Sequence, residues 1–121
     1  MMKDRMHHSA YSLDEPRRKI VLEAMQEVCR YRNWGLLAAH VRPKHAHAVV
    51  EAEVVPETIL NKFKSYGSRR LNRSHLEKRR KKRWTRGGSK LYLWTNESVE
   101  SAIDYVLHKQ GTPMAIYPSK L

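Results

Sequence analysis

Residues 34–54 of the chain read WGLLAAHVRPKHAHAVVEAEV, and this stretch decides the fold. Two apolar runs, residues 34–41 and 45–54, are separated only by an Arg-Pro-Lys turn, which predicts a β-hairpin. Apolar residues occupy both alternating sides of the second run, with Ala46 and Ala48 on one side and Val49 on the other. Such strands are typical of the middle of a sheet that is covered on both faces.

Helical and strand patterns surround the hairpin. The sequence SLDEP at residues 12–16 is typical of a helix start, and apolar residues then recur at helical spacing. Pro56 opens a second helix, residues 89–95 alternate as in a strand, and a last helix ends before Gly111. The predicted order is therefore helix, strand, strand, helix, strand, helix.

This order lacks only a leading strand to complete a ferredoxin-like fold. We therefore expect an α/β (α+β) domain in which an antiparallel sheet carries its helices on one face. Residues 1–11 are a poor candidate for the leading strand. The expected organisation is an N-terminal arm at residues 1–12, the domain at 13–111 and a C-terminal tail without clear periodicity at 112–121.

Composition points to a polyanionic partner. The chain has 121 residues, enough for one domain, with a net charge of +12 and an isoelectric point near 10.1. We expect nucleic acid rather than a membrane, because the densest basic stretch has no matching apolar face. The single cysteine, Cys29, excludes an internal disulfide framework. A cytoplasmic, nucleoid-associated protein of prokaryotic type is the expectation.

Ten Lys and Arg residues fall between residues 69 and 86, against the single acid Glu77. Cations in such a run are expected to contact phosphates rather than bases. The alternative is a solvated face or a flexible arm. The candidate DNA-binding residues are Lys64, Arg69, Arg70, Arg73, Lys81, Lys82, Arg83 and Arg86.

The motif His45-Ala46-His47 is a candidate chemical site. Because a strand repeats every two residues, both imidazoles project from one face and could hold a single divalent metal. Tyr105, in a helical pattern, could supply a nucleophile beside it. The alternatives are two core or surface histidines and a tyrosine whose ring is merely packed. A structural zinc site is disfavoured, because the other histidines lack finger-like spacing.

Four strings in this order carry a resemblance to a known family. They are AHVRPKHAHAVV at 39–50, FKSYGSRRLN at 63–72, RWTRGGS at 83–89 with YLW at 92–94, and YVLHKQG at 105–111. The first resembles the HUH motif (His, hydrophobic residue, His) of single-tyrosine transposases, and the others resemble the segments that follow it in that family. The similarity runs from about residue 13 to residue 111. It is closest to the branch associated with repetitive extragenic palindromes.

The resemblance implies an enzyme that cleaves and rejoins single-stranded DNA beside a hairpin, with a divalent Mg²⁺ or Mn²⁺ ion and a 5′-phosphotyrosine intermediate. It makes His45 and His47 metal ligands and Tyr105 the nucleophile. Gln110 matches the third ligand. His108 is a rival for that place, because on an ideal helix it is rotated from Tyr105 by only about 60°. The alternative function is a domesticated or truncated protein that binds hairpin nucleic acid without cutting it.

Two features depart from the family. Pro43-Lys44 replaces a small polar pair between the strands. The family's leading strand, which is rich in aromatic residues and threonine, has no counterpart before residue 13. In a ferredoxin-like sheet this would leave one side of the strand at 45–54 unpaired, which is an aggregation hazard. A truncated gene or a strand from a second subunit would explain the gap, and we expect a homodimer.

Overall fold

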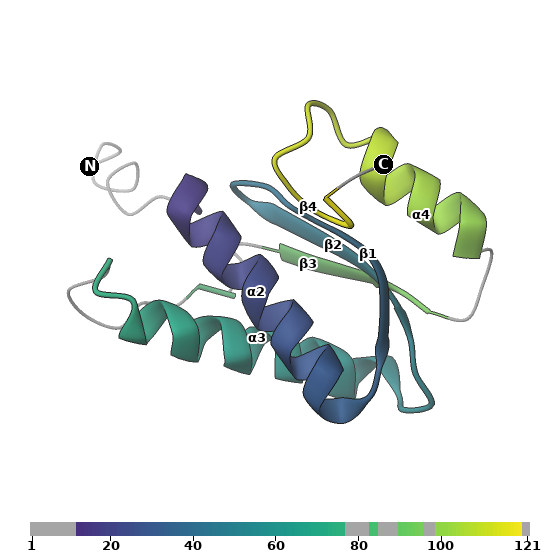
Figure 1. Cartoon of the computed structure of the whole chain (residues 1–121), viewed down its shortest axis with the longest axis horizontal. Helices are drawn as coiled ribbons and strands as arrows, with labels where there is room; N and C mark the ends of the chain where they lie inside the picture. The colour runs from purple at the N-terminus through teal and green to yellow at the C-terminus, as the bar shows by residue number, and fades with distance from the viewer. Residues whose placement is uncertain (1–11, 77–82, 85–89, 96–98, 120–121) are drawn as a thin grey trace, which may run out of the picture.

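The computed structural model describes residues 12–76, 83–84, 90–95 and 99–119. Within these residues, a four-stranded sheet of order β3-β2-β1-β4 packs against three helices (Figure 1). The chain order is α2, β1, β2, α3, β3, α4 and β4, so every element that the sequence predicts is present. The α+β class is confirmed.

Helix α2, Glu15–Arg32, begins where the sequence predicts. The Asp14 side chain accepts a hydrogen bond from the backbone N–H of Arg17 at 3.2 Å and so caps the helix. Asn33 ends the helix in the left-handed conformation with φ of 62°. Cys29 lies on the buried side of α2, where burial raises the pKa of its thiol to about 12. This cysteine is therefore protonated and serves as a packing residue.

The predicted hairpin is confirmed. Strand β1, Gly35–Val41, pairs antiparallel with β2, His45–Glu51, and His40 lies opposite His47. One element was missed: residues in the expected C-terminal tail form β4, Ala115–Tyr117, which pairs antiparallel with β1. Three residues are too short a run to show a strand period in the sequence.

The third predicted strand corrects the expected sheet. Strand β3, Lys90–Trp94, pairs with β2 in parallel, from His45 opposite Lys90 to Val49 opposite Trp94. The sheet is therefore mixed and not antiparallel as expected. The expectation of an unpaired side on β2 is also wrong, because β3 occupies it. The homodimer stays a prediction, but the bare strand edge that suggested it does not exist.

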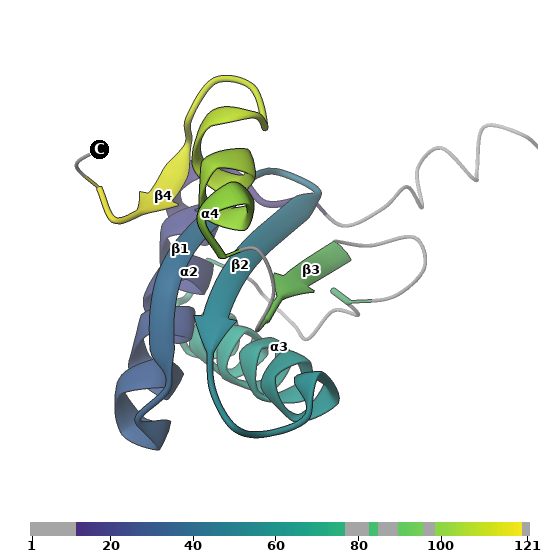
Figure 2. The ribbon, with the colours of Figure 1, turned by 90° about the vertical axis from the view of Figure 1, so that its right-hand side faces the viewer.

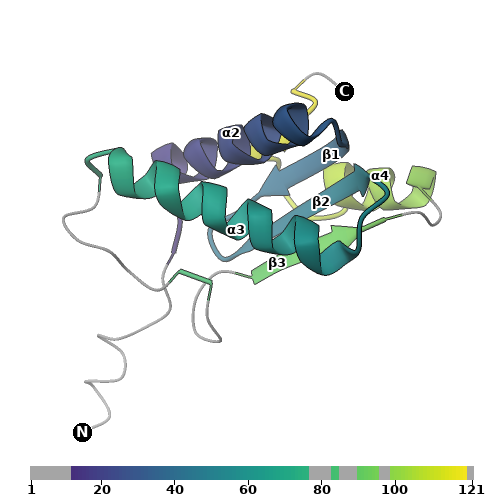
Figure 3. The ribbon, with the colours of Figure 1, turned by 90° about the horizontal axis from the view of Figure 1, so that it is seen from below.

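The helices cover both faces of the sheet, which corrects the expectation of helices on one face. Helices α2 and α3, Pro56–Arg73, lie side by side on one face, and α4, Val99–His108, lies on the other (Figures 2 and 3). The larger core is built around α2, α3 and the sheet. A smaller cluster on the α4 face contains the buried residues Ala38, Val49, Ala102, Val106 and Leu107.

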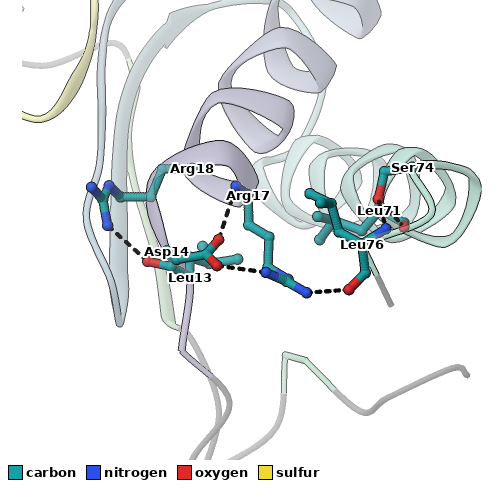
Figure 4. A network of polar contacts seen from close by, with 7 residues as sticks. All are labelled: Leu13, Asp14, Arg17, Arg18, Leu71, Ser74 and Leu76. Atoms are coloured by element: carbon teal, nitrogen blue, oxygen red, sulfur yellow. Dashed lines mark hydrogen bonds and ion pairs between the residues drawn. The ribbon is translucent and has the colours of Figure 1, made fainter. Parts of the chain in front are cut away.

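Polar contacts tie the start of α2 to the end of α3 (Figure 4). The Arg17 guanidinium pairs with the Asp14 carboxylate at 2.6 Å and also donates to the carbonyl oxygen of Leu76. The Ser74 hydroxyl donates to the carbonyl of Leu71 at 2.7 Å and accepts from the N–H of Leu76 at 3.2 Å. The first turn of α2 thus holds the point where the chain leaves α3 and enters the basic segment.

Candidate active site

The residues predicted to carry chemistry meet on the α4 face of the sheet. His45, His47 and Val49 alternate along β2, and Val49 packs in the α4 cluster, so both imidazoles project toward that face. Tyr105 lies on α4 with its ring in edge contact with His47, at 6.2 Å between ring centroids. Tyr105 is 45% exposed. Folding therefore brings together residues almost 60 positions apart.

Two aromatic residues of β3 complete the surroundings of His47. Tyr92 stacks on the imidazole at 4.8 Å and 16°, and Trp94 stacks on it at 5.4 Å and 25°. Trp94 also contacts Tyr105, at 5.6 Å between centroids. Burial and the nearby His45 lower the pKa of His47 to about 4. His47 is therefore neutral at pH 7, which is the form that binds metals.

One feature of the histidine pair fits a metal ion. The Nδ1 atom of His47 is buried and has no hydrogen-bond partner among the described residues, which is costly for a polar atom. The two ring centroids lie 6.3 Å apart. Two imidazoles bound to one ion at the tetrahedral angle have centroids about 5.4 Å apart, so the exposed His45 ring must turn toward His47 for both to bind the same ion.

Gln110 and His108 compete for the place of a third ligand. No group of three His, Cys, Asp or Glu side chains in the described part of the chain could hold a metal. Helix α4 ends at His108, so Gln110 lies beyond it and the ideal-helix comparison between the two candidates does not apply. Gln110 is half-buried and His108 is exposed. Both stay candidates.

His40 is a site residue that sequence reasoning missed. It is fully buried on β1, directly opposite His47 of β2. Its Nδ1–H donates to the carbonyl of Val106 at 3.2 Å, and its Nε2 accepts from the backbone N–H of Met114 at 3.0 Å. A ring with one donor and one acceptor is neutral, and burial lowers the pKa of His40 accordingly. His40 therefore fastens the turn that carries Tyr105 to the sheet.

The signal for His40 was present in the sequence. His40 lies in an apolar run two residues after Ala38, and a lone histidine among buried positions needs hydrogen-bond partners. Those partners are backbone groups of α4 and of the segment before β4. No sequence pattern predicts these hydrogen-bond partners.

The predicted DNA-binding residues divide into groups. Arg69 and Arg73 are exposed, and the Arg69 guanidinium lies 4.8 Å from the centre of the Tyr66 ring. Lys64 is half-buried. These three lie on α3, on the side of the sheet opposite Tyr105 (Figure 2). Lys81, Lys82 and Arg86 lie outside the described residues.

Two of the arginines are engaged within the fold. Arg70, expected to contact DNA, bridges α3 to α2 through Glu23 at 3.2 Å and Glu27 at 3.0 Å. Arg83, expected to contact phosphate, is 3% exposed and donates to the side chain of Asn72 at 2.8 Å. As positioned, Arg83 offers little surface to a phosphate and joins the basic segment to α3.

Comparison with known proteins supports a nucleic-acid enzyme. None of the described helices is long and apolar enough to cross a membrane. No curated protein and no solved structure matches the chain. A family model described as "Transposase IS200 like" matches residues 5–108, which includes the hairpin with His45 and His47 and the helix with Tyr105. On this match, over most of its length, the chain belongs to the family of IS200-like transposases.

Proposed function

We propose that this protein cleaves and rejoins single-stranded DNA beside hairpins, with Tyr105 as the nucleophile. The observation that carries the proposal is the contact between Tyr105 on α4 and His47 on β2, at 6.2 Å between ring centroids. A tyrosine, a neutral buried imidazole and an exposed imidazole share one accessible face. Family membership supplies the reaction class, a DNA strand transfer.

The proposed reaction exchanges one phosphodiester bond for another. The Tyr105 hydroxyl oxygen attacks phosphorus, a new P–O bond forms to tyrosine, and the bond from phosphorus to the 3′ oxygen breaks. The phenolic proton is lost and the released 3′ oxygen takes up a proton. The product is a 5′-phosphotyrosine, so the energy of the broken bond is retained for rejoining by the reverse step.

His45 and His47 would hold a divalent ion, Mg²⁺ or Mn²⁺, and Gln110 or His108 would complete its protein ligands. When bound, such an ion neutralises charge that develops on a scissile phosphate. The stacking of Tyr92 and Trp94 on His47 restricts the imidazole to one orientation. A ligand held in place loses less conformational freedom when it binds.

The positive charge of the protein favours DNA as its partner. A net charge of +12 on a chain of 121 residues favours a polyanion. Arg69 and Arg73 are exposed on α3, and Lys81, Lys82 and Arg86 follow in the sequence. Contacts by Arg69 and Arg73, on the face away from Tyr105, would hold the stem of a hairpin while the single strand reaches the active site.

A covalent adduct tests the nucleophile. We expect labelled single-stranded DNA from around the gene to become attached to the protein in the presence of Mn²⁺. Tyr105→Phe should abolish the adduct while DNA affinity changes less than twofold, because only the attacking oxygen is removed. Tyr31→Phe is the matched control, since Tyr31 is exposed on α2. Hairpin binding without any adduct under these conditions would identify a non-catalytic binding protein instead.

The metal ligands need a separate test. His45→Ala and His47→Ala should each weaken Mn²⁺ binding about 10-fold or more in calorimetry and reduce adduct formation in parallel. Excess Mn²⁺ should partly rescue either single substitution but not the double. Gln110→Ala and His108→Ala, compared side by side, should identify the third ligand by the same loss. Equal Mn²⁺ binding by the wild type and the double variant would show that these histidines hold no metal.

A further inference from the structure

Strand β3 presents a polar and aromatic strip beside the histidine pair. Parallel pairing places Lys90 opposite His45 and Tyr92 opposite His47. Residues two apart on a strand point to the same face, so Lys90, Tyr92 and Trp94 share the face that carries Tyr105. The intervening Leu91 and Leu93 pack into the larger core on the other face. These two leucines anchor β3 to the core, so the strip of Lys90, Tyr92 and Trp94 is held in place.

Tyr92 differs from the other aromatic residue on this strip. Trp94 is half-buried and contacts both His47 and Tyr105, so its place is explained by packing. Tyr92 is 41% exposed even though one face of its ring covers His47. A ring that is held nearly parallel to a fixed neighbour and still open to water is preorganised to receive another flat group.

A positive charge lies two residues before Tyr92, on the same face of β3. Lys90 is exposed and begins β3, where its backbone N–H donates to the carbonyl of Lys44 at 3.0 Å. Residues i and i+2 on a strand lie about 6.6 Å apart on the same face, so the Lys90 ammonium and the Tyr92 ring project side by side. An aromatic ring beside a lysine therefore matches one base and its phosphate, as in proteins that bind single strands by stacking.

We propose that Tyr92 and Lys90 form a single-strand binding site, in which Tyr92 stacks on an unpaired nucleobase and Lys90 contacts a neighbouring phosphate. The site would hold the nucleotide next to the phosphate that Tyr105 attacks. The inference rests on the proposed function for its ligand, but it assigns to β3 a role in recognition that is separate from cleavage. Stacking of this kind tolerates any base, since every base has a flat face.

Two ligands with the same phosphates separate stacking from charge. The binding of a 12-nucleotide oligothymidylate and of an abasic strand of equal length is measured in the Tyr105→Phe protein, which forms no adduct. We expect a preference for the strand with bases of roughly 5- to 100-fold per stacked base. Tyr92→Ala and Tyr92→Leu should both lose this preference, and Tyr92→Phe should retain it. Lys90→Gln should weaken both ligands alike and reduce the slope of log affinity against log salt by about one.

The control is Tyr31→Ala, which removes a tyrosine that is 75% exposed on α2, away from this face. It should leave the preference unchanged. The proposal is overturned if Tyr92→Ala and Tyr92→Leu keep the wild-type preference, or if Tyr31→Ala lowers it equally. A base preference that depends on Tyr92, with no adduct formed by wild-type protein on any DNA, would uphold this site and reject Tyr105 cleavage. An adduct with no role for Tyr92 would do the reverse.

Discussion

The two faces of the sheet use alternate residues of the same strand for different purposes. From β2, Ala46 and Ala48 face α2 and α3 in a core whose largest buried side chain is Phe63, whereas His45 and His47 face α4. The first face is closed by two helices of 18 residues and the second by one helix of 10. The first face holds the larger buried core, and the second leaves Tyr105 partly exposed.

The two faces also differ in the partners that their polar side chains find. On the α2 and α3 side, Arg70 finds carboxylates on a neighbouring helix, so charge is matched within the fold. On the α4 side, His40 is satisfied by backbone groups while the Nδ1 atom of His47 has no partner among the residues described. A polar atom left in this state inside a folded protein points to a partner outside the chain. The comparison gives four predictions.

The largest effect should come from the larger core. Phe63→Ala deletes a ring that is 1% exposed, and we expect a loss of about 3–5 kcal/mol in the free energy of unfolding. Urea denaturation followed by circular dichroism measures this loss. The control Tyr31→Ala should change stability by less than about 0.5 kcal/mol. A small loss for Phe63→Ala would mean that the α2 and α3 face does not dominate stability.

His40→Ala should break the attachment of α4. The carbonyl of Val106 and the N–H of Met114 would both lose their partner, and a cavity would remain. We expect a loss of about 2–4 kcal/mol in unfolding free energy, together with reduced adduct formation by Tyr105 in protein that is still folded. His40→Asn, which keeps one donor and one acceptor, should be less damaging. If His40→Ala is as stable as the wild type, then His40 does not hold α4 to the sheet.

Acid should destabilise the α4 face selectively. Burial lowers the pKa of both His40 and His47, the latter to about 4. In the unfolded chain these rings titrate near 6.5, so between about pH 6.5 and 4 the unfolded state binds more protons. Their contribution to stability is therefore complete above pH 6.5 and falls as the pH drops toward 4.

The loss should reach roughly 1–3 kcal/mol in metal-free protein, measured by urea denaturation in a chelator at several pH values. The double variant His40→Asn and His47→Asn should show a flatter profile over the same range. Parallel profiles for the variant and the wild type would assign the acid sensitivity to other groups.

The smallest effects should distinguish the two kinds of arginine on α3. Arg70→Gln breaks ion pairs with Glu23 and Glu27 and should lower stability by about 0.5–1 kcal/mol with little change in DNA affinity. Arg73→Gln, at an exposed position, should leave stability unchanged and lower the salt dependence of DNA binding by about one unit of slope. Equal effects of the two substitutions on DNA binding would show that Arg70 leaves its acids to contact phosphate.

Much of the local structure followed from the sequence because its causes are local. The start of α2 within residues 12–16 and the hairpin around Pro43 each depend on neighbouring residues, and both predictions are confirmed. The spacing of His45 and His47 placed both imidazoles on one face of a strand, since the period of two is a property of the backbone. The class of the fold followed from the order in which these local patterns occur along the chain.

Only the tertiary structure decided which elements became neighbours. The alternation of β3 shows that Tyr92 and Leu91 point to opposite faces, but it does not show that β3 pairs with β2 in parallel. The burial of Arg83 and the partners of His40 likewise depend on segments distant in the chain. Periodicity is set by the geometry of one segment. Pairing is a competition among many segments that could bury the same apolar surface, and it is settled by packing of the whole chain.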